Sequence, residues 1–213
     1  MEKEELINEL ILNGYLKNDS LISAFLNVDR KDFVLDEYKN VAYENIPLPI
    51  GYNQTISQPL TIAFMLEFLE PKVGEKVLEV GTGSGWQTAL LAYLIKDEEN
   101  KNSGKVISLE RIKELKDFAY QNLMKYDELS KNIILLVRDG SLGFEEESPF
   151  DKIIVAAAAD EIPQPLKEQL KIGGRMVIPV KNSIVVLDKI SSNEFKKMEF
   201  FGFSFVPLVK DEN

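Results

Sequence analysis

A short apolar run followed by three alternate glycines constrains this chain more than any other feature. Residues 77–80 have the character of a buried strand, and Gly81, Gly83 and Gly85 follow before a second apolar run. Glycine tolerates a positive φ and lacks a Cβ, so its backbone can pass close to a ligand, and the start of the next helix offers free N–H groups. The pattern predicts a strand, a turn and a helix that together hold a nucleotide-like cofactor.

The place of the third glycine narrows the choice of cofactor. A dinucleotide-binding turn has the spacing G-x-G-x-x-G, in which the last glycine clears the pyrophosphate. Here Trp86 takes that place, and Gly85 comes one residue early. The turn therefore favours a cofactor without a pyrophosphate, such as S-adenosylmethionine, over a nicotinamide dinucleotide. The alternative is a glycine-rich turn that binds nothing.

The length of the chain fits one domain. With 213 residues, 45% of them hydrophobic and 28% charged, the chain can bury one sizeable core and is short for two. We expect a single domain over 1–213. Within it, we expect N-terminal helices and a substrate-side loop over 1–57, a cofactor-binding α/β core over 58–180 and a C-terminal hairpin over 181–213.

Two missing residue types limit the chemistry. Because there is no cysteine, disulfides, thiolate nucleophiles and cysteine-based metal sites are excluded. Because there is no histidine, the usual near-neutral base and the commonest metal ligand are absent too. We expect no metal site, and chemistry that depends on carboxylates, hydroxyls, amides, lysines or a cofactor.

The net charge and the lengths of the apolar runs indicate which partners and which cellular location to expect. A formal net charge of −10 repels phosphate backbones, so nucleic acid is a disfavoured partner. No apolar run approaches the length of a membrane span, and residues 1–5 are mostly charged, unlike a secretion signal. We expect a monomeric, cytoplasmic protein that does not bind membranes.

Strands alternate with helices along the middle of the chain. The strand-like runs after the glycine turn are 105–109, 133–137, 152–157 and 175–180, and helical patterns lie near 88–95, 111–125 and 163–171. This alternation predicts a Rossmann-like α/β fold with a doubly wound, mostly parallel sheet. Runs at 183–189 and 196–206 predict an antiparallel hairpin on the sheet edge, and the polar run 96–104 predicts a solvated loop.

The N-terminal part combines helices with a long connection. Apolar residues recur at helical spacing over 6–16 and again over 21–26. Residues 29–54 show little periodicity and are too apolar for disorder, so we expect a long ordered loop. A helix buried on most sides follows over 58–69, with Pro59 in its first turn.

Residues that follow the strands are candidates for ligand contacts, because open α/β sheets bind ligands beyond the carboxyl ends of their strands. Glu110 is placed to accept from both ribose hydroxyls of an adenosine, although alone it is more often the acid at a helix start. Asp139 and Gly140 can bind an adenine amino group and let its ring approach, although an Asp-Gly pair is also a common turn. The small residues 156–159 leave room for a flat or bulky group.

Several separated motifs form one pattern: Ile-Pro-Leu-Pro-Ile-Gly at 46–51, Gln-Thr-Ile-Ser-Gln-Pro at 54–59 and the glycine turn. Together they resemble the protein-L-isoaspartate O-methyltransferase family. The resemblance continues through Pro-Phe-Asp at 149–151, the alanine run, residues 169–175 and Phe-Val-Pro-Leu at 205–208, so it covers most of the chain. The Thr-Ile-Ser segment is the specific mark, since a glycine-rich turn alone would indicate only some class I methyltransferase.

The resemblance implies transfer of a methyl group from S-adenosylmethionine to the carboxylate of an L-isoaspartyl residue in a damaged protein or peptide. This step starts the repair of the residue and leaves S-adenosylhomocysteine as the product. A carboxylate is already a nucleophile at neutral pH and the sulfonium is already activated, so the displacement needs positioning more than a base. A chain without histidine or cysteine can perform it.

The same resemblance implies roles for individual residues. Ser57 would be the active-site serine that orients the substrate carboxylate, and its structural alternative is an N-cap of the helix that follows. The cofactor would be held by Glu79, Gly81, Thr82, Gly83, Ser84, Gly85, Glu110, Arg111, Asp139 and Gly140. The substrate would be held by Ile50, Gly51, Thr55, Ile56, Ser57 and Ala157.

A few positions depart from the family pattern and keep alternatives open. Tyr52 and Asn53 follow Gly51, Arg138 stands where a glycine usually precedes the acid, and a histidine that some relatives carry after the serine is missing. The alternatives are a class I methyltransferase that acts on a small molecule or RNA, and a relative that binds the cofactor without turnover. The acidity of the chain weighs against RNA.

Overall fold

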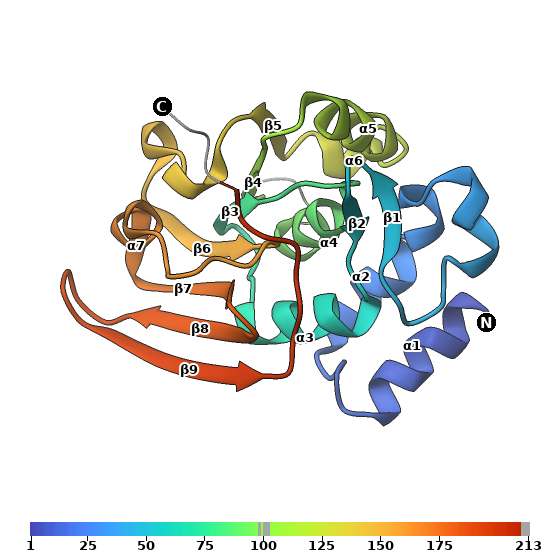
Figure 1. The fold of residues 1–213 in the computed structure, drawn as a ribbon, viewed down its shortest axis with the longest axis horizontal. Coiled ribbons are helices and arrows are strands. Elements are labelled where there is room, and N and C mark those ends of the chain that lie inside the picture. Colours follow the sequence, from blue (N-terminus) through green and yellow to red (C-terminus); the bar gives the residue numbers. More distant parts are fainter. Residues whose placement is uncertain (98, 100–102, 210–213) are drawn as a thin grey trace.

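The computed structural model describes residues 1–97, 99 and 103–209 (Figure 1). The solvated loop predicted at 96–104 lies partly outside these residues, as do the last four residues of the predicted C-terminal part. Within the described residues, no helix is both long and apolar enough to span a bilayer.

A seven-stranded sheet forms the centre of the molecule, with the strand order β5-β4-β3-β6-β7-β8-β9. Its strands are β3 (Lys76–Val80), β4 (Lys105–Glu110), β5 (Ile133–Val137), β6 (Phe150–Val155), β7 (Leu170–Val180), β8 (Ser183–Lys189) and β9 (Phe195–Phe201). The pairings from β5 to β7 are parallel, and the pairings of β8 with β7 and β9 are antiparallel. The predicted α/β fold with a mostly parallel sheet and a C-terminal hairpin is therefore confirmed.

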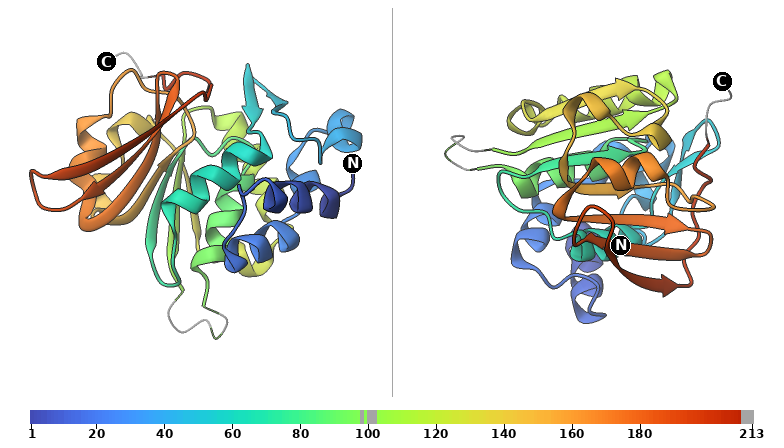
Figure 2. Two further views of the ribbon diagram at one scale, coloured as in Figure 1. Left: turned by 90° about the horizontal axis from the view of Figure 1, so that it is seen from below. Right: turned by 90° about the vertical axis from the view of Figure 1, so that its left-hand side faces the viewer.

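Helices cover both faces of this sheet, as Figure 2 shows. They are α1 (Lys3–Leu12), α2 (Asp19–Asn27), α3 (Pro59–Leu69), α4 (Trp86–Ile95), α5 (Lys113–Leu123), α6 (Asp127–Ser130) and α7 (Gln164–Gln169). Side chains alternate along a strand, so Val77 packs with the core shared by α1 to α5, whereas Leu78 packs with the core on the side of α7. Both residues are fully buried, which accounts for the apolar runs without alternation in the sequence.

The prediction of one long loop over 29–54 was wrong. The segment contains two 3₁₀ helices, Arg30–Phe33 (η1) and Asp36–Val41 (η2), and then the strand β1 (Leu48–Gly51), which pairs with β2 (Gln54–Ile56). Pro47, directly before β1, and Pro49, within it, argue against a strand at this place, because proline is rare inside strands. The hairpin turn is also atypical: Tyr52 and Asn53 both adopt a positive φ, of 54° and 55°, without the usual Asn-Gly pair.

Several element boundaries differ from the predicted ones, and glycines explain two of them. α1 ends at Leu12 because Gly14 turns the chain with a φ of 73°, although Leu16 still packs into the core. β9 ends at Phe201 rather than 206, directly before Gly202 with its φ of 97°. β7 starts at Leu170, whereas the predicted strand began at 175 and the predicted helix continued to 171.

Candidate cofactor and substrate cleft

A cleft opens beyond the carboxyl ends of β3, β4 and β6, where the strand order reverses on either side of β3. It encloses about 870 Å³ including its open mouth. The predicted site residues among its walls are Thr55, Ile56, Ser57, Gly81, Thr82, Gly83, Ser84, Glu110, Arg111, Gly140 and Ala157. The fold therefore brings the Thr-Ile-Ser segment and the glycine turn to one cleft, although about 25 residues separate them in the sequence.

The glycine turn needs glycine for packing as well as for backbone conformation. Gly81 has a φ of 92°, and a Cβ there would lie 3.3 Å from the Cβ of Ala156 on β6's extension. Gly85 has a φ of 90° and precedes α4, where a Cβ would meet Ala119 at 3.2 Å and Leu123 at 3.3 Å. Gly85 lies outside the cleft walls, so in this structure it serves the close approach of α5 to the turn.

Glu79 lies beneath the turn, completely buried, rather than in the cleft wall. Its carboxylate accepts hydrogen bonds from Gln87 Nε2 at 2.9 Å, Thr88 Oγ1 at 2.5 Å and Ser108 Oγ at 2.6 Å. Burial raises the pKa of Glu79 to about 7, against the opposing effect of these donors. Ser108 also shares a hydrogen bond of 2.6 Å with Thr82, so Glu79 anchors the turn through a neighbouring strand.

Glu110 is held at the cleft by two backbone donors. Its Oε2 accepts from the Gly83 N–H and its Oε1 from the Ile112 N–H, both at 3.0 Å, and the residue is 6% exposed. The second bond is that of an acid at a helix start, because Ile112 precedes α5. Each carboxylate oxygen keeps a further acceptor site, so the ribose role and the structural role are compatible.

Asp139 and Gly140 have different places. Gly140 lines the cleft, and a Cβ there would lie 2.3 Å from Cγ1 of Val80, so packing against β3 requires glycine. Asp139 lies outside the cleft walls, and its Oδ1 accepts from the Ser141 N–H at 2.8 Å to cap a short 3₁₀ helix. This bond is the turn role that the sequence left open for Asp139, and the adenine role stays a prediction.

Ser57 is not the N-cap of α3, so the structural alternative given for it does not hold. The N-cap position belongs to Gln58, and the helix donor Leu60 N–H is instead accepted by Asn45 Oδ1 at 3.0 Å. Among the residues that the structure describes, the Ser57 hydroxyl has no hydrogen-bond partner, whereas its carbonyl accepts from Arg30 at 3.1 Å. Ser57 borders both the main cleft and an adjoining hollow lined by Thr55, Pro47, Gln58, Thr61 and Phe205.

Two predicted substrate residues lie outside the main cleft. Ile50 is buried and covers the turn, with Cδ1 3.4 Å from where a Cβ of Gly83 would be. Gly51 is exposed at the end of β1. Thr55 is exposed and borders both hollows, so the hairpin contributes through β2 rather than through β1.

The C-terminal segment contributes wall residues that sequence reasoning did not assign. Val206, Pro207 and Leu208 line the cleft. The chain reaches this place after β9, along the red segment in Figure 1. Backbone hydrogen bonds hold the segment on the alanine run: Ala158 N–H donates to Val206 at 2.8 Å, and Leu208 N–H donates to Ala158 at 2.7 Å. The family-like run at 205–208 was the available signal.

The strand, glycine turn and helix beside a cleft at the point of strand reversal define the class of protein, a Rossmann-like class I methyltransferase fold. A solved S-adenosylmethionine-dependent O-methyltransferase from Thermotoga maritima shares this fold with a TM-score of 0.50 at 21% identity, over 77% of this chain and 70% of that one. A family model described as protein-L-isoaspartate(D-aspartate) O-methyltransferase (PCMT) matches residues 1–213. The chain belongs to this family.

Individual relatives agree with the family match. The chain is 46% identical to a protein-L-isoaspartate O-methyltransferase of Dictyoglomus turgidum over 97% of its length and 90% of the relative's. It is 43% identical to the one of Methanopyrus kandleri, over 99% and 92%. A Plasmodium falciparum protein, described as a protein-L-isoaspartate O-methyltransferase and crystallised with S-adenosyl-L-homocysteine, superposes with a TM-score of 0.88 at 30% identity, over 99% and 100%.

Proposed function

We propose that this chain transfers the methyl group of S-adenosylmethionine to the carboxylate of L-isoaspartyl residues in damaged proteins or peptides, and so initiates their repair. The observation that carries the proposal is the meeting of Ser57 with the glycine turn and Glu110 in one cleft. A cofactor-binding turn alone would support any methyl transfer. The Thr-Ile-Ser segment beside it supports this particular substrate.

The cleft walls fit S-adenosylmethionine. Two buried polar atoms there, Trp86 Nε1 and Gln87 Oε1, have no hydrogen-bond partner among the described residues, and such atoms are normally satisfied by a ligand or water. The Glu110 carboxylate would hold the ribose hydroxyls, and Gly81, Thr82, Gly83 and Ser84 would approach the methionine end. Arg111, Asp139 and Gly140 would lie on the adenosine side, while Glu79 and Gly85 would support the turn from outside the cleft.

The proposed reaction requires this chain to position the substrate carboxylate relative to the methyl group of the cofactor. When bound, S-adenosylmethionine supplies a methyl group already activated on a sulfonium. The Ser57 hydroxyl, which the helix cap does not use, would donate to the substrate carboxylate and orient one of its oxygens toward that methyl group. Thr55, Ile56 and Ala157 would line the substrate side, and Ile50 and Gly51 would shape it through the hairpin. The carboxylate oxygen would bond to the methyl carbon while the methyl–sulfur bond breaks and leaves its electron pair on sulfur, which gives S-adenosylhomocysteine. Because the attacking oxygen carries no proton, no base is required.

Several finer points also belong to the proposal. We propose a monomeric, cytoplasmic enzyme that does not bind nucleic acid, which the net charge of −10 supports. We also propose a single domain whose parts 1–57, 58–180 and 181–213 serve the substrate side, the cofactor and the sheet edge. The wall residues Val206 to Leu208 extend the role of the last part to the cleft itself.

Replacement of Ser57 by alanine tests the assigned role. Ser57→Ala should lower turnover of an isoaspartyl peptide at least tenfold and leave S-adenosylhomocysteine affinity, measured by titration calorimetry, within about twofold, because the hydroxyl acts on the substrate. Ser192→Ala, on the exposed loop between β8 and β9, is the matched control and should change neither quantity. Unchanged turnover in Ser57→Ala would overturn the assignment.

A further inference from the structure

Arg30 is a buried arginine next to the cleft that the proposed chemistry does not use. It lies in η1, is 2% exposed, and its guanidinium donates to four main-chain carbonyls. Three of them belong to the connection before β1: Ala42, Glu44 at 3.4 Å and Ile46 at 2.9 Å. The fourth is the carbonyl of Ser57, at 3.1 Å from Nη2.

The guanidinium of Arg30 makes no ion pair within the described part of the chain, so these carbonyls stabilise its charge through the two terminal nitrogens, while its Nε has no hydrogen-bond partner there. A buried charge is costly unless hydrogen bonds surround it, and a guanidinium presents its donors in a rigid planar fork. Burial lowers the pKa of Arg30 to about 9, which still leaves the group protonated at neutral pH. The Arg30 side chain thus holds the main chain of the 42–46 segment next to the main chain of Ser57 by hydrogen bonds to one charged group.

The other side of the same guanidinium faces the cofactor turn. Its central carbon lies 5.3 Å from the centre of the Trp86 ring, a cation–π distance. Trp86 is the first residue of α4, directly after Gly85, and it lines the cleft. Arg30 therefore contacts both the segment that carries Ser57 and the helix that begins at the glycine turn.

The 42–46 segment is in turn tied to the start of α3. Asn45 Oδ1 accepts from the Leu60 N–H, and the Asn45 carbonyl accepts from Gln58 Nε2 at 2.8 Å. Ser57 lies directly before these residues, and its own side chain makes no hydrogen bond within the described part. Its place relative to the turn thus depends on Arg30 and on the segment that Arg30 holds.

We propose that Arg30 is a positioning residue for the isoaspartyl substrate, which fixes the main chain at Ser57 relative to the cofactor turn without touching the substrate. The inference rests on the function proposed above. An in-line displacement is sensitive to small misplacements of the attacking oxygen, so loss of the fork lowers kcat for the peptide more than it weakens cofactor binding.

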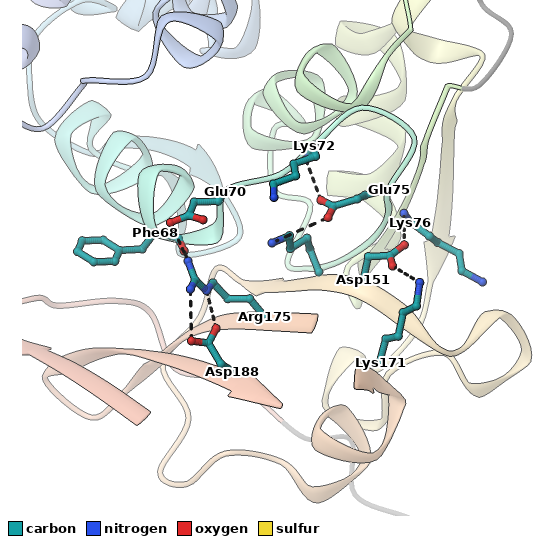
Figure 3. Close-up of polar contacts among 10 residues, drawn as sticks. Phe68, Glu70, Lys72, Glu75, Lys76, Asp151, Lys171, Arg175 and Asp188 are labelled. Atoms are coloured by element: carbon teal, nitrogen blue, oxygen red, sulfur yellow. Dashed lines mark hydrogen bonds and ion pairs between the residues drawn. The ribbon is translucent and has the colours of Figure 1, made fainter. Parts of the chain in front are cut away.

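The test compares two arginines. Arg30→Lys and Arg30→Met are set against Arg175→Lys and Arg175→Met, because Arg175 also donates to a main-chain carbonyl, that of Phe68 at 3.0 Å, but at the far end of the sheet (Figure 3). For each variant, kcat and KM are measured on an isoaspartyl peptide, S-adenosylhomocysteine affinity by calorimetry and the folded fraction by circular dichroism.

We expect Arg30→Met to lower kcat at least tenfold and Arg30→Lys to recover part of that loss, with cofactor affinity within about threefold of the wild type in both. The Arg175 variants should keep kcat per folded molecule. If Arg30→Met does not fold, Arg30→Lys decides, since a lysine cannot present the fork. The inference would be overturned if Arg30→Lys kept the wild-type kcat and Arg30→Met either kept it as well or lost activity only in proportion to its loss of folded protein. If Arg30→Met does not fold, a wild-type kcat in Arg30→Lys alone would overturn it. A wild-type enzyme that binds S-adenosylhomocysteine but does not methylate the peptide would overturn the proposed function instead.

Discussion

Charged groups at the two ends of the central sheet have different partners, apart from the exposed ion pair of Arg138 and Glu146 that follows β5. At the amino end, charged groups at the starts of β3, β6 and β7 meet partners of opposite charge (Figure 3). Arg175 contacts Asp188 at 2.6 Å and Glu70 at 2.9 Å, and Lys171 contacts Asp151 at 2.6 Å. At the carboxyl end, Glu79 and Arg30 are both buried and are surrounded by hydroxyl, amide and carbonyl groups instead.

The pKa shifts of Arg175, Glu79 and Arg30 follow this difference, whereas burial lowers the pKa of Lys152 at the amino end, although Glu75 lies 4.0 Å from its Nζ. The hydrogen bond to Asp188 raises the pKa of Arg175 and so favours its charged form. Burial raises the pKa of Glu79 and lowers that of Arg30, so both are shifted toward their neutral forms. Such shifts concentrate at functional sites, where geometry is fixed at some expense in stability. We infer that the amino end stabilises the sheet and the carboxyl end shapes the cleft.

The largest expected effect comes from Glu79→Gln. Below pH 4.5 Glu79 is protonated in both states. Between pH 4.5 and about 7 the folded state keeps the proton that the unfolded state loses, so the free energy of unfolding falls as pH rises, by at most about 1.4 kcal/mol per pH unit. Glutamine lacks this penalty and preserves the side-chain shape.

Urea denaturation of both proteins from pH 4 to 8 measures this effect. The stability of Glu79→Gln relative to the wild type should rise through that window and level off above pH 7, by on the order of 3 kcal/mol in total. If the difference in free energy of unfolding between Glu79→Gln and the wild type did not change with pH, burial would not shift the pKa of Glu79, and the contrast between the two ends would fail there.

A smaller effect is expected from Glu110→Gln, which removes a charge from the cleft while keeping its size. S-adenosylhomocysteine affinity, measured by calorimetry, should fall about 10- to 100-fold, because hydrogen bonds to a charged acceptor contribute about 1.5–3 kcal/mol. Glu70→Gln, which changes an acid of the amino-end cluster, is the control and should bind as the wild type does. Equal losses in both variants would contradict a cofactor role confined to the carboxyl end.

The smallest effect is expected from Arg175→Met. Its partly exposed ion pairs are screened by solvent, so we expect a loss of about 1–2 kcal/mol in the free energy of unfolding, including the lost bond to Phe68. Urea denaturation measures the loss, and kcat for an isoaspartyl peptide should stay unchanged. A large fall in kcat per folded molecule would show that the amino end also controls the cleft.

The parts of the site that the sequence predicts are those that depend on local conformation. Gly81, Gly83 and Glu110 follow strands at fixed offsets, so the turn and the acid that meets it can be placed from the order of elements alone. The sheet itself follows from strand runs that are mostly apolar and do not alternate with polar residues.

The parts that the sequence did not predict depend on long-range partners. Asn45, rather than Ser57, accepts from the first turn of α3, and no spacing rule covers a cap 15 residues away. Arg30 had no signature because its partners are main-chain carbonyls, which every residue carries. For Asp139 the sequence allowed both a turn role and a ligand role. The structure adds the bond from the Ser141 N–H and the close packing of Gly140 on Val80, which depends on a residue far away in the sequence.

One measurement tests the central claim most directly: transfer of labelled methyl from S-adenosylmethionine to two synthetic peptides that differ only in carrying isoaspartate or normal aspartate at one position. We predict base-labile label on the isoaspartyl peptide alone. Binding of the cofactor with no label on either peptide would contradict the account.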